Sequence, residues 1–202
     1  MLAVTGATGH VGNTLVRELI KRGYSVRAIV PPKEDVSSLN DLDIEIFLAD
    51  VRDAARIKRA LTGVDGVFHL AGIISIVPGK EHLLNEVNVK GTKNIVNACL
   101  ELGVKRLVYT SSVHAFVEPP KGTVITENTL IDPETVKGPY GKSKAMATLA
   151  VEEGIKKGLN AVIVFPSGVI GPYDYKVSEM GQLLLDYAKG YFYYVDGEYD
   201  FV

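Results

Sequence analysis

Two short stretches contain residue types that could carry out chemistry. Residues 5–12 read Thr-Gly-Ala-Thr-Gly-His-Val-Gly, near the start of the chain. Residues 140–144 read Tyr-Gly-Lys-Ser-Lys, more than a hundred residues downstream. Glycines at this spacing suit the pyrophosphate of a dinucleotide, and a tyrosine with a nearby lysine suits proton transfer. Found together and in this order, the two stretches favour a redox enzyme.

The glycines of the first stretch fall three residues apart, between an apolar run and an amphipathic one. In such a strand–turn–helix unit Gly6 permits the tight turn, Gly9 lets the backbone approach a pyrophosphate, and Gly12 lets the helix pack closely on the sheet. The helix N-terminus adds free N–H groups and a partial positive charge. The first interval is one residue longer than in G-x-G-x-x-G. Such glycines can be purely structural, but the flanking elements favour dinucleotide binding.

Tyr140 and Lys144 are four residues apart, so on a helix they share one face. A phenol with a pKa of about 10 is too weakly acidic for efficient proton transfer near neutrality. We expect the Lys144 ammonium to lower the pKa of Tyr140, and the same lysine could hydrogen-bond the nicotinamide ribose. An incidental pair on a solvated helix is the alternative, which the upstream glycine turn disfavours.

A third polar group is expected at the end of the fifth predicted strand, where residues 109–112 read Tyr-Thr-Ser-Ser. Parallel sheets bind ligands at the carboxyl ends of their strands. A hydroxyl there could hydrogen-bond a substrate carbonyl oxygen and stabilise developing alkoxide charge. At least one of the three hydroxyls at positions 110–112 is expected only to cap the strand end.

The elements that must position these residues alternate along the chain. Short β-branched runs predict strands at 2–5, 25–30, 44–48, 66–70, 106–111 and 161–165. Amphipathic stretches predict helices at 11–22, 53–61, 83–102 and 140–157. Strands separated by helices form right-handed crossovers, so we expect an α/β fold with a doubly wound, Rossmann-type parallel sheet. The long irregular connection 118–138 is a candidate substrate lid.

Composition argues against several other classes of protein. The formal net charge of -2 gives no basic field for nucleic acid or an anionic membrane, and no apolar run reaches the ~20 residues of a membrane span. The single cysteine, Cys99, rules out an intramolecular disulfide and suits a reducing compartment. The histidines and Cys99 lack metal-ligand spacing, so we expect no metal. Because the first strand starts at once, we expect no signal peptide and a cytoplasmic protein.

Beyond these patterns, the turn T-G-x-x-G-x-x-G resembles that of the short-chain dehydrogenase/reductase superfamily. The whole chain is similar to its extended branch, which includes dihydroflavonol-reductase-like enzymes and nucleotide-sugar epimerases. Asp50-Val51 resembles the pair that borders adenine, and residues 69–72, His-Leu-Ala-Gly, resemble the segment on the ribose side. Residues 88–92, Asn-Val-Lys-Gly-Thr, resemble a helix motif of this branch. Residues 165–172, Phe-Pro-Ser-Gly-Val-Ile-Gly-Pro, resemble the turn beside the nicotinamide carboxamide.

The resemblance implies a set of site residues. The catalytic residues would be Ser112, Tyr140 and Lys144, with Ser112 chosen because the extended branch ends this strand in Ser/Thr-Ser-Ser. The cofactor, NADP or NAD, would be bound by Gly6, Thr8, Gly9, His10, Val11, Gly12, Asp50, Val51, Leu70, Ala71, Gly72, Thr110, Tyr140, Lys144, Pro166, Ser167, Gly168 and Val169. The helices at 83–102 and 140–157 face a second subunit in many relatives, which implies a homodimer.

The implied reaction is reduction of a small-molecule ketone or aldehyde. Hydride passes from C4 of the reduced nicotinamide to the carbonyl carbon, Tyr140 protonates the oxygen, and Ser112 orients it. A nucleotide-sugar epimerase or dehydratase with tightly held NAD would use the same residues. Dehydratases typically add an acid near the catalytic serine, whereas Val113 and His114 follow Ser112 here. A nucleotide-sensing protein without turnover is a third possibility.

The chain departs from the family where the second strand ends. NAD-preferring members usually place an acid there, but this strand ends Ile29-Val30-Pro31-Pro32. NADP-preferring members often have arginine in place of Pro31, and Lys33 or Arg27 could contact a 2′-phosphate instead. The missing acid slightly favours NADP.

A second departure is length. Extended members continue well beyond 202 residues, and the last residues here resemble an internal strand of the family. We therefore expect a piece of a longer protein. Residues 1–172 would form the NAD(P)-binding Rossmann domain with the catalytic residues, and residues 173–202 would begin a truncated substrate-binding portion.

Overall fold

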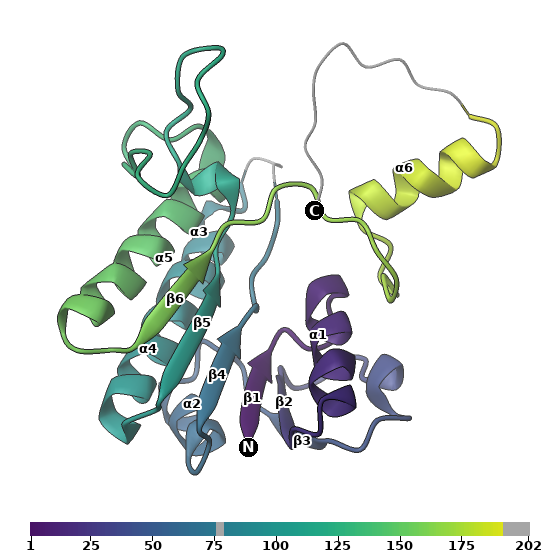
Figure 1. Ribbon diagram of the computed structural model, residues 1–202, viewed down its shortest axis with the longest axis vertical. Coiled ribbons are helices and arrows are strands. Elements are labelled where there is room, and N and C mark those ends of the chain that lie inside the picture. Colours follow the sequence, from purple (N-terminus) through teal and green to yellow (C-terminus); the bar gives the residue numbers. More distant parts are fainter. Residues whose placement is uncertain (76–78, 192–202) are drawn as a thin grey trace.

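A computed structural model of the chain describes residues 1–75 and 79–191. Its centre is a six-stranded sheet in the order β3-β2-β1-β4-β5-β6, and every neighbouring pair is parallel (Figure 1). The strands are β1 Leu2–Thr5, β2 Val26–Val30, β3 Glu45–Leu48, β4 Gly66–His69, β5 Arg106–Thr110 and β6 Ala161–Val164. The predicted α/β class and doubly wound parallel sheet are confirmed.

Helices cover both faces of this sheet. The α-helices are α1 His10–Lys21, α2 Ala54–Leu61, α3 Glu81–Leu84, α4 Gly91–Leu102, α5 Gly138–Lys156 and α6 Glu179–Ala188. Two 3-10 turns, η1 Ser37–Leu39 and η3 Val113–Ala115, lie between them. The helix predicted at 83–102 is interrupted, because a π-helical turn, η2 Asn85–Lys90, separates α3 from α4.

Apolar packing on the two faces explains the strand patterns. On the α1 side, Val4 and Val30 pack with Val16 in one buried cluster. On the opposite side, α4 packs against both α2 and α5, and Leu107 lies in a larger cluster with Ile95. Strands buried on both faces read as nearly continuous apolar runs, as these sequences do.

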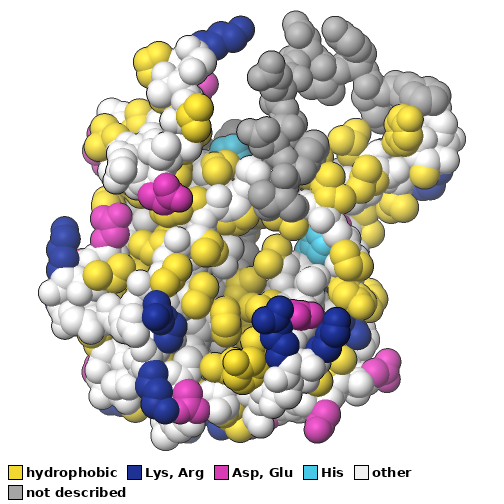
Figure 2. All heavy atoms as spheres, in the orientation of Figure 1, with side chains coloured by type: hydrophobic (Ala, Val, Ile, Leu, Met, Phe, Trp, Pro, Cys, Tyr) yellow, Lys and Arg dark blue, Asp and Glu magenta, His cyan; other side chains and the backbone are white. Residues whose placement is uncertain are grey.

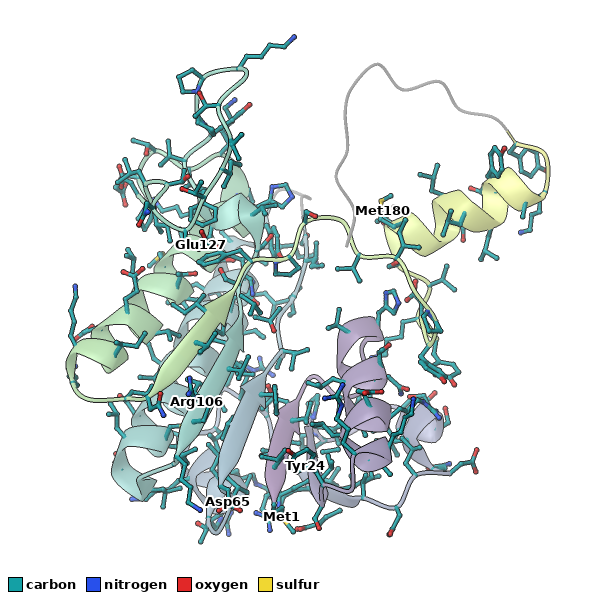
Figure 3. All side chains as sticks on the ribbon, viewed as in Figure 1. Met1, Tyr24, Asp65, Arg106, Glu127 and Met180 are labelled. Carbon is teal, nitrogen blue, oxygen red and sulfur yellow. The ribbon has the colours of Figure 1, made fainter. Side chains whose placement is uncertain are left out.

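The strand order reverses between β1 and β4. In doubly wound sheets, ligands bind at such a switch point, outside the carboxyl ends of the strands. Figure 3 places Met1, Tyr24, Asp65 and Arg106 at the amino edge of the sheet, and Glu127 and Met180 on the opposite side. The loops that could hold a ligand therefore gather at the carboxyl edge. The predicted lid, residues 118–138, lies at this edge without a helix or strand before Gly138.

The chain after β6 crosses the carboxyl edge toward α1 and then forms α6 (Figure 1). None of the residues of α6 is buried, and hydrophobic side chains gather on its surface (Figure 2). These include Leu183, Leu184, Leu185 and Tyr187. The proposed domain boundary at residue 172 stays a prediction, and residues 192–202 lie outside the described part of the chain. Within the described residues, no helix is long and apolar enough to cross a membrane.

Candidate active site

The glycine turn between β1 and α1 is closed too tightly for side chains. Gly6 has a φ of 72°, and a Cβ on it would lie 2.8 Å from the Ala71 backbone nitrogen. A Cβ on Gly12 would lie 2.0 Å from the Gly6 carbonyl oxygen. Close backbone approach therefore excludes a side chain at both positions. At Gly12 the near atoms belong to the turn itself, whereas the sequence predicts close packing of the helix on the sheet.

The start of α1 offers free donors at this turn. Its N-cap residue is Gly9, which makes no side-chain capping hydrogen bond. The first N–H groups of a helix have no partner within the helix, and they carry the positive end of its dipole. These features fit the pyrophosphate of a dinucleotide, which His10, Val11 and Gly12 would bind through their backbone nitrogens.

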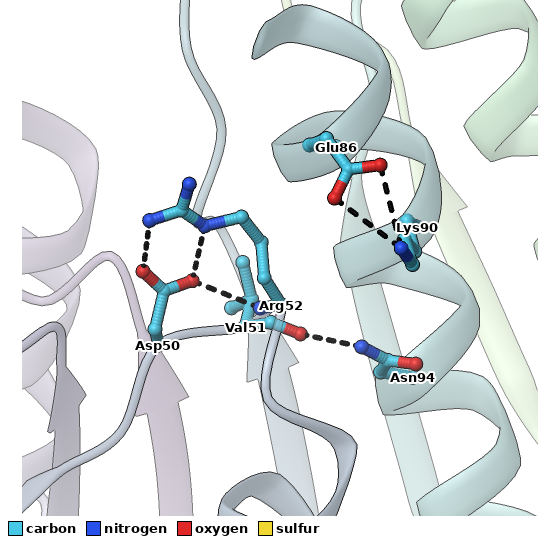
Figure 4. A network of polar contacts seen from close by, with 6 residues as sticks. All are labelled: Asp50, Val51, Arg52, Glu86, Lys90 and Asn94. Carbon is cyan, nitrogen blue, oxygen red and sulfur yellow. Dashed lines mark hydrogen bonds and ion pairs between the residues drawn. The ribbon is translucent and has the colours of Figure 1, made fainter. Parts of the chain in front are cut away.

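The predicted adenine border is held by side chains from two neighbouring elements (Figure 4). Arg52 donates to both carboxylate oxygens of Asp50, over 2.9 and 2.6 Å, and holds the pKa of that carboxyl below its usual value. The Asn94 amide donates to the Val51 carbonyl oxygen over 2.8 Å. A Cβ on Gly91 would lie 2.6 Å from Val51 Cγ2, so α4 packs directly on this pair. The sequence did not reveal the role of Arg52.

The segment after β4 is fixed to β1 by two hydrogen bonds. The Leu70 N–H donates to the Thr5 carbonyl over 3.2 Å, and the Ala71 N–H donates to Thr5 Oγ1 over 3.2 Å. A Cβ on Gly72 would lie 3.3 Å from Asn88 Oδ1 and 3.9 Å from Lys144 Nζ. Gly72 therefore lies next to the predicted catalytic lysine.

His69 lies below this segment and is fully buried. Its Nδ1 is 2.7 Å from Thr5 Oγ1, and its Nε2 is 3.0 Å from Thr92 Oγ1. Because the Thr92 hydroxyl donates to the Asn88 carbonyl over 2.6 Å, Nε2 must carry the proton and Nδ1 must accept. Burial, together with the charge of Lys144, lowers the pKa of His69 to about 3. A neutral imidazole thus joins β1 and β4 to the first turn of α4.

Asn88 lies on the π-helical turn, and the sequence identified it only as part of a family helix motif, without a role at the site. Its side chain accepts from the Ile73 N–H over 2.8 Å and donates to the Ile73 carbonyl over 3.0 Å. It also donates to Ser143 Oγ over 2.9 Å. Asn88 therefore ties the segment after β4 to α5, the helix that carries Tyr140.

Lys144 is buried on α5, with 6% of its surface exposed. Its ammonium donates to the Thr110 carbonyl oxygen over 2.8 Å and lies 5.0 Å from the centre of the Tyr109 ring. Burial lowers the pKa of Lys144 to about 8. An ammonium has three donors, so this geometry leaves capacity for a ribose hydroxyl.

Tyr140 lies one helical turn before Lys144, and the structure corrects the expected direction of its pKa. Burial raises the pKa of Tyr140, and a hydrogen bond with the Ser112 side chain acts in the opposite direction. Lys144 is not among the causes of this shift, and its ammonium donates to the Thr110 carbonyl oxygen. Ser112 Oγ also accepts from the His114 N–H over 3.2 Å. The structure thus brings Ser112 and Tyr140 together.

A close approach at Gly141 positions Tyr140. A Cβ on Gly141 would lie 2.7 Å from the His114 carbonyl oxygen and 2.8 Å from Val136 Cγ1. The first turn of α5 therefore rests directly on η3, and the Tyr140 ring meets the His114 ring edge-on at 6.0 Å. Ser111 has a structural role instead, since its hydroxyl lies 2.6 Å from Thr148 Oγ1 in the core.

The predicted nicotinamide turn, Pro166, Ser167, Gly168 and Val169, spans the carboxyl edge between η3 and α1. At one end the Val113 N–H donates to the Pro166 carbonyl over 3.2 Å. Beyond the other end, His10 Nε2 lies 3.1 Å from the Gly171 carbonyl oxygen. A cavity of about 270 Å³ adjoins this segment and α6. It is lined by His10, Val169, Ile170, Gly171, Asp174, Val177, Gly181, Leu184 and Leu185.

The sequence analysis did not anticipate two charged residues that lie beside the glycine turn, Glu34 and Lys176. Glu34 accepts from the Thr8 hydroxyl over 2.9 Å, and Lys176 forms an ion pair with Glu34. Glu34 follows the last glycine by about 20 residues, the spacing of an acid that binds the adenosine ribose. That spacing could have identified Glu34, whereas nothing in the sequence pointed to Lys176. No cluster of three or more metal-ligating side chains occurs among the described residues.

Comparison with known proteins agrees with this architecture. The chain is 38% identical over 200 residues to sterol demethylase protein B of Methylococcus capsulatus, which covers 98% of this chain and 61% of that protein. It is 34% identical over 210 residues to cinnamoyl-CoA reductase 1 of Oryza sativa, with 95% and 61% covered. A dTDP-glucose 4,6-dehydratase from Streptomyces venezuelae, crystallised with NAD, matches with a TM-score of 0.81 at 25% identity, covering 94% and 62%.

The chain thus spans about three fifths of the length of these relatives. Nearly the whole chain, residues 3–201, matches the model of the 3-beta hydroxysteroid dehydrogenase/isomerase family. The glycine turn, the parallel sheet and the match along nearly the entire chain agree with one another. The chain belongs to the 3-beta hydroxysteroid dehydrogenase/isomerase family, within the extended short-chain dehydrogenase/reductase superfamily.

Proposed function

We propose that this protein is an NAD(P)-dependent oxidoreductase that reduces a ketone or aldehyde, or oxidises the corresponding alcohol. One observation carries the proposal: Tyr140 lies close enough to Ser112 for that side chain to act on its pKa, and one helical turn further along α5 the Lys144 ammonium is buried at the edge that holds the glycine turn. A proton donor, an oxygen-binding hydroxyl and a fixed cation are the groups that carbonyl reduction requires of a protein.

Each residue then has a defined role. The bound dinucleotide supplies or accepts the hydride. Tyr140 donates a proton to the carbonyl oxygen during reduction and accepts it during oxidation, while Ser112 hydrogen-bonds that oxygen and stabilises its developing charge. Lys144 holds the ribose through the donors that Thr110 leaves free. Because burial raises the pKa of Tyr140, the phenol is protonated at neutral pH and carries the proton that reduction needs.

Carbonyl reduction is favoured over dehydration of a nucleotide sugar by the residues next to Ser112. Ser112 is followed by Val113 and His114, where a dehydratase typically places an acid.

The cofactor is a nicotinamide dinucleotide, either NAD or NADP, which carries an additional 2′-phosphate. The end of β2 lacks an acid, which slightly favoured NADP, yet Glu34 reaches the turn from farther along the chain.

The test is a titration of the protein with NADH and NADPH, followed by a panel of ketones, aldehydes and nucleotide sugars. We expect loss of the reduced-dinucleotide absorbance with a ketone or aldehyde. Turnover of nucleotide sugars alone, with NAD that copurifies, would establish the epimerase or dehydratase alternative. Dinucleotide binding without turnover of any compound would favour the sensing protein.

A further inference from the structure

Three segments far apart in the sequence meet beside the glycine turn. Thr8 lies within the turn, Glu34 follows β2, and Lys176 belongs to the segment after β6. The Thr8 hydroxyl donates to Glu34 Oε1 over 2.9 Å. The Lys176 ammonium donates to the same carboxylate oxygen and to Thr8 Oγ1, the latter over 3.3 Å. One anion and one cation therefore share a hydroxyl of the turn.

Contacts along α1 fix the segment that carries Lys176. The Thr14 hydroxyl donates to the Pro172 carbonyl oxygen over 3.2 Å. The Arg17 guanidinium lies 4.5 Å from the centre of the Tyr173 ring and 3.4 Å from the Tyr175 hydroxyl. Lys176 thus reaches the turn from a backbone that is attached to α1, which limits the positions its ammonium can take.

Glu34 is also held in place. Its side chain is 23% exposed, and hydrogen bonding to Lys176 is the main cause that lowers its pKa, so it is ionised at neutral pH. An acid at this spacing after the glycines accepts hydrogen bonds from the hydroxyl groups of the adenosine ribose. A carboxylate accepts from two hydroxyls but repels a 2′-phosphate, which carries like charge.

We propose that Glu34 selects NAD over NADP, and that Lys176, contributed from beyond β6, is the cation that would bind a 2′-phosphate once the Glu34 charge is removed. This inference rests on the proposed function, since it concerns the dinucleotide of the same site. It assigns cofactor choice to two residues outside the glycine turn, and one of them lies more than 160 residues from it.

Fluorescence titrations with NADH and NADPH test the assignment without any need for turnover. We expect the unsubstituted protein to bind NADH about tenfold more tightly than NADPH. Glu34→Gln removes the charge and keeps the shape, so NADH binding should weaken about tenfold and NADPH binding should tighten about tenfold. In Glu34→Gln/Lys176→Met the gain for NADPH should disappear, because the partner of the phosphate is gone.

Asp35→Asn is the matched control, because it removes a negative charge next to Glu34 in the sequence. The Asp35 carboxylate accepts from the Ser37 N–H, whereas Glu34 accepts from the Thr8 hydroxyl. Its NADH-to-NADPH ratio should stay within about twofold of the original. Circular dichroism and thermal unfolding verify that each variant is folded, and Glu34→Ser serves as a second neutral substitution.

An unchanged ratio in both Glu34 variants would overturn the role of Glu34. A gain for NADPH that persists in the double variant would overturn the role of Lys176. Failure of the unsubstituted protein to bind either dinucleotide would overturn the proposed function together with this inference, so the two failures are distinguishable.

Discussion

Gly141→Ala tests whether close packing of α5 on η3 positions Tyr140, the proposed catalytic tyrosine. The added Cβ would lie 2.7 Å from the His114 carbonyl oxygen, while ordinary contact begins near 3.4 Å, so the two must separate by about 0.7 Å. The partner is backbone, and no side-chain rotation relieves the contact. The first turn of α5, with Tyr140, must therefore move away from η3 and Ser112.

The expected cost follows from that displacement. A misplacement of about 1 Å can lower a rate about 100-fold, so we expect kcat/KM for carbonyl reduction to fall about 30- to 100-fold. Crowding costs about 1–3 kcal/mol, and the better helix propensity of alanine returns up to about 1 kcal/mol. Dinucleotide affinity should change less than about threefold, since the glycine turn is untouched.

Gly154→Ala on the same helix is the matched control. Its Cβ would lie 2.6 Å from Val96 Cγ1, so it crowds the core comparably but far along α5 from Tyr140. We expect a similar loss of thermal stability, of about 2–8 °C, with kcat/KM within about threefold of the original. Equal activity of both variants, in a reduced-dinucleotide absorbance assay, would refute the claim that contact with η3 sets the position of Tyr140.

Four other predictions concern the turn, the lysine, the cysteine and the assembly. Gly12→Ala places a Cβ 2.0 Å from the Gly6 carbonyl oxygen and should abolish dinucleotide binding in titration, whereas Gly23→Ala, which meets no atom within 4 Å, should keep it. Burial lowers the pKa of Lys144 to about 8, so its ammonium loses its charge as the pH rises through that value. A pH profile of kcat/KM should therefore fall above pH 8, and a flat profile would contradict a role for the charged Lys144. Burial raises the pKa of Cys99 to about 12, so iodoacetamide should leave Cys99 unmodified in the native protein, as mass spectrometry would show. We also propose a homodimer through α4 and α5, for which sedimentation should give twice 21.9 kDa, and a monomer mass would contradict it.

Local patterns predicted the fold well, because each depends on neighbouring residues. Apolar runs located all six strands, and the helix expected at 140–157 is observed at Gly138–Lys156. The spacing of the glycines located the turn, because backbone atoms lie so close to Gly6 and Gly12 that neither position can carry a side chain. The π-helical turn was not predictable, because the apolar pattern of 83–102 suits a continuous helix equally well.

Tertiary contacts account for what the sequence did not reveal at the site. Glu34 and Lys176 are 142 residues apart and meet only because the segment after β6 returns to α1. The pKa direction expected for Tyr140 was wrong for a related reason. Spacing placed Lys144 on the same helix face as Tyr140. It could not show that the Lys144 ammonium donates to the Thr110 carbonyl, or that burial is the main cause of the pKa shift of Tyr140.

The central claim is that the Tyr140 phenol transfers the proton while the glycine turn holds the dinucleotide. Tyr140→Phe removes only the hydroxyl, so its NADH and NADPH affinities and its turnover of a carbonyl substrate should be measured side by side. We predict affinities within about threefold of the original and a turnover at least about 100-fold lower. Turnover that persists at the original rate, with either dinucleotide bound, would contradict the claim.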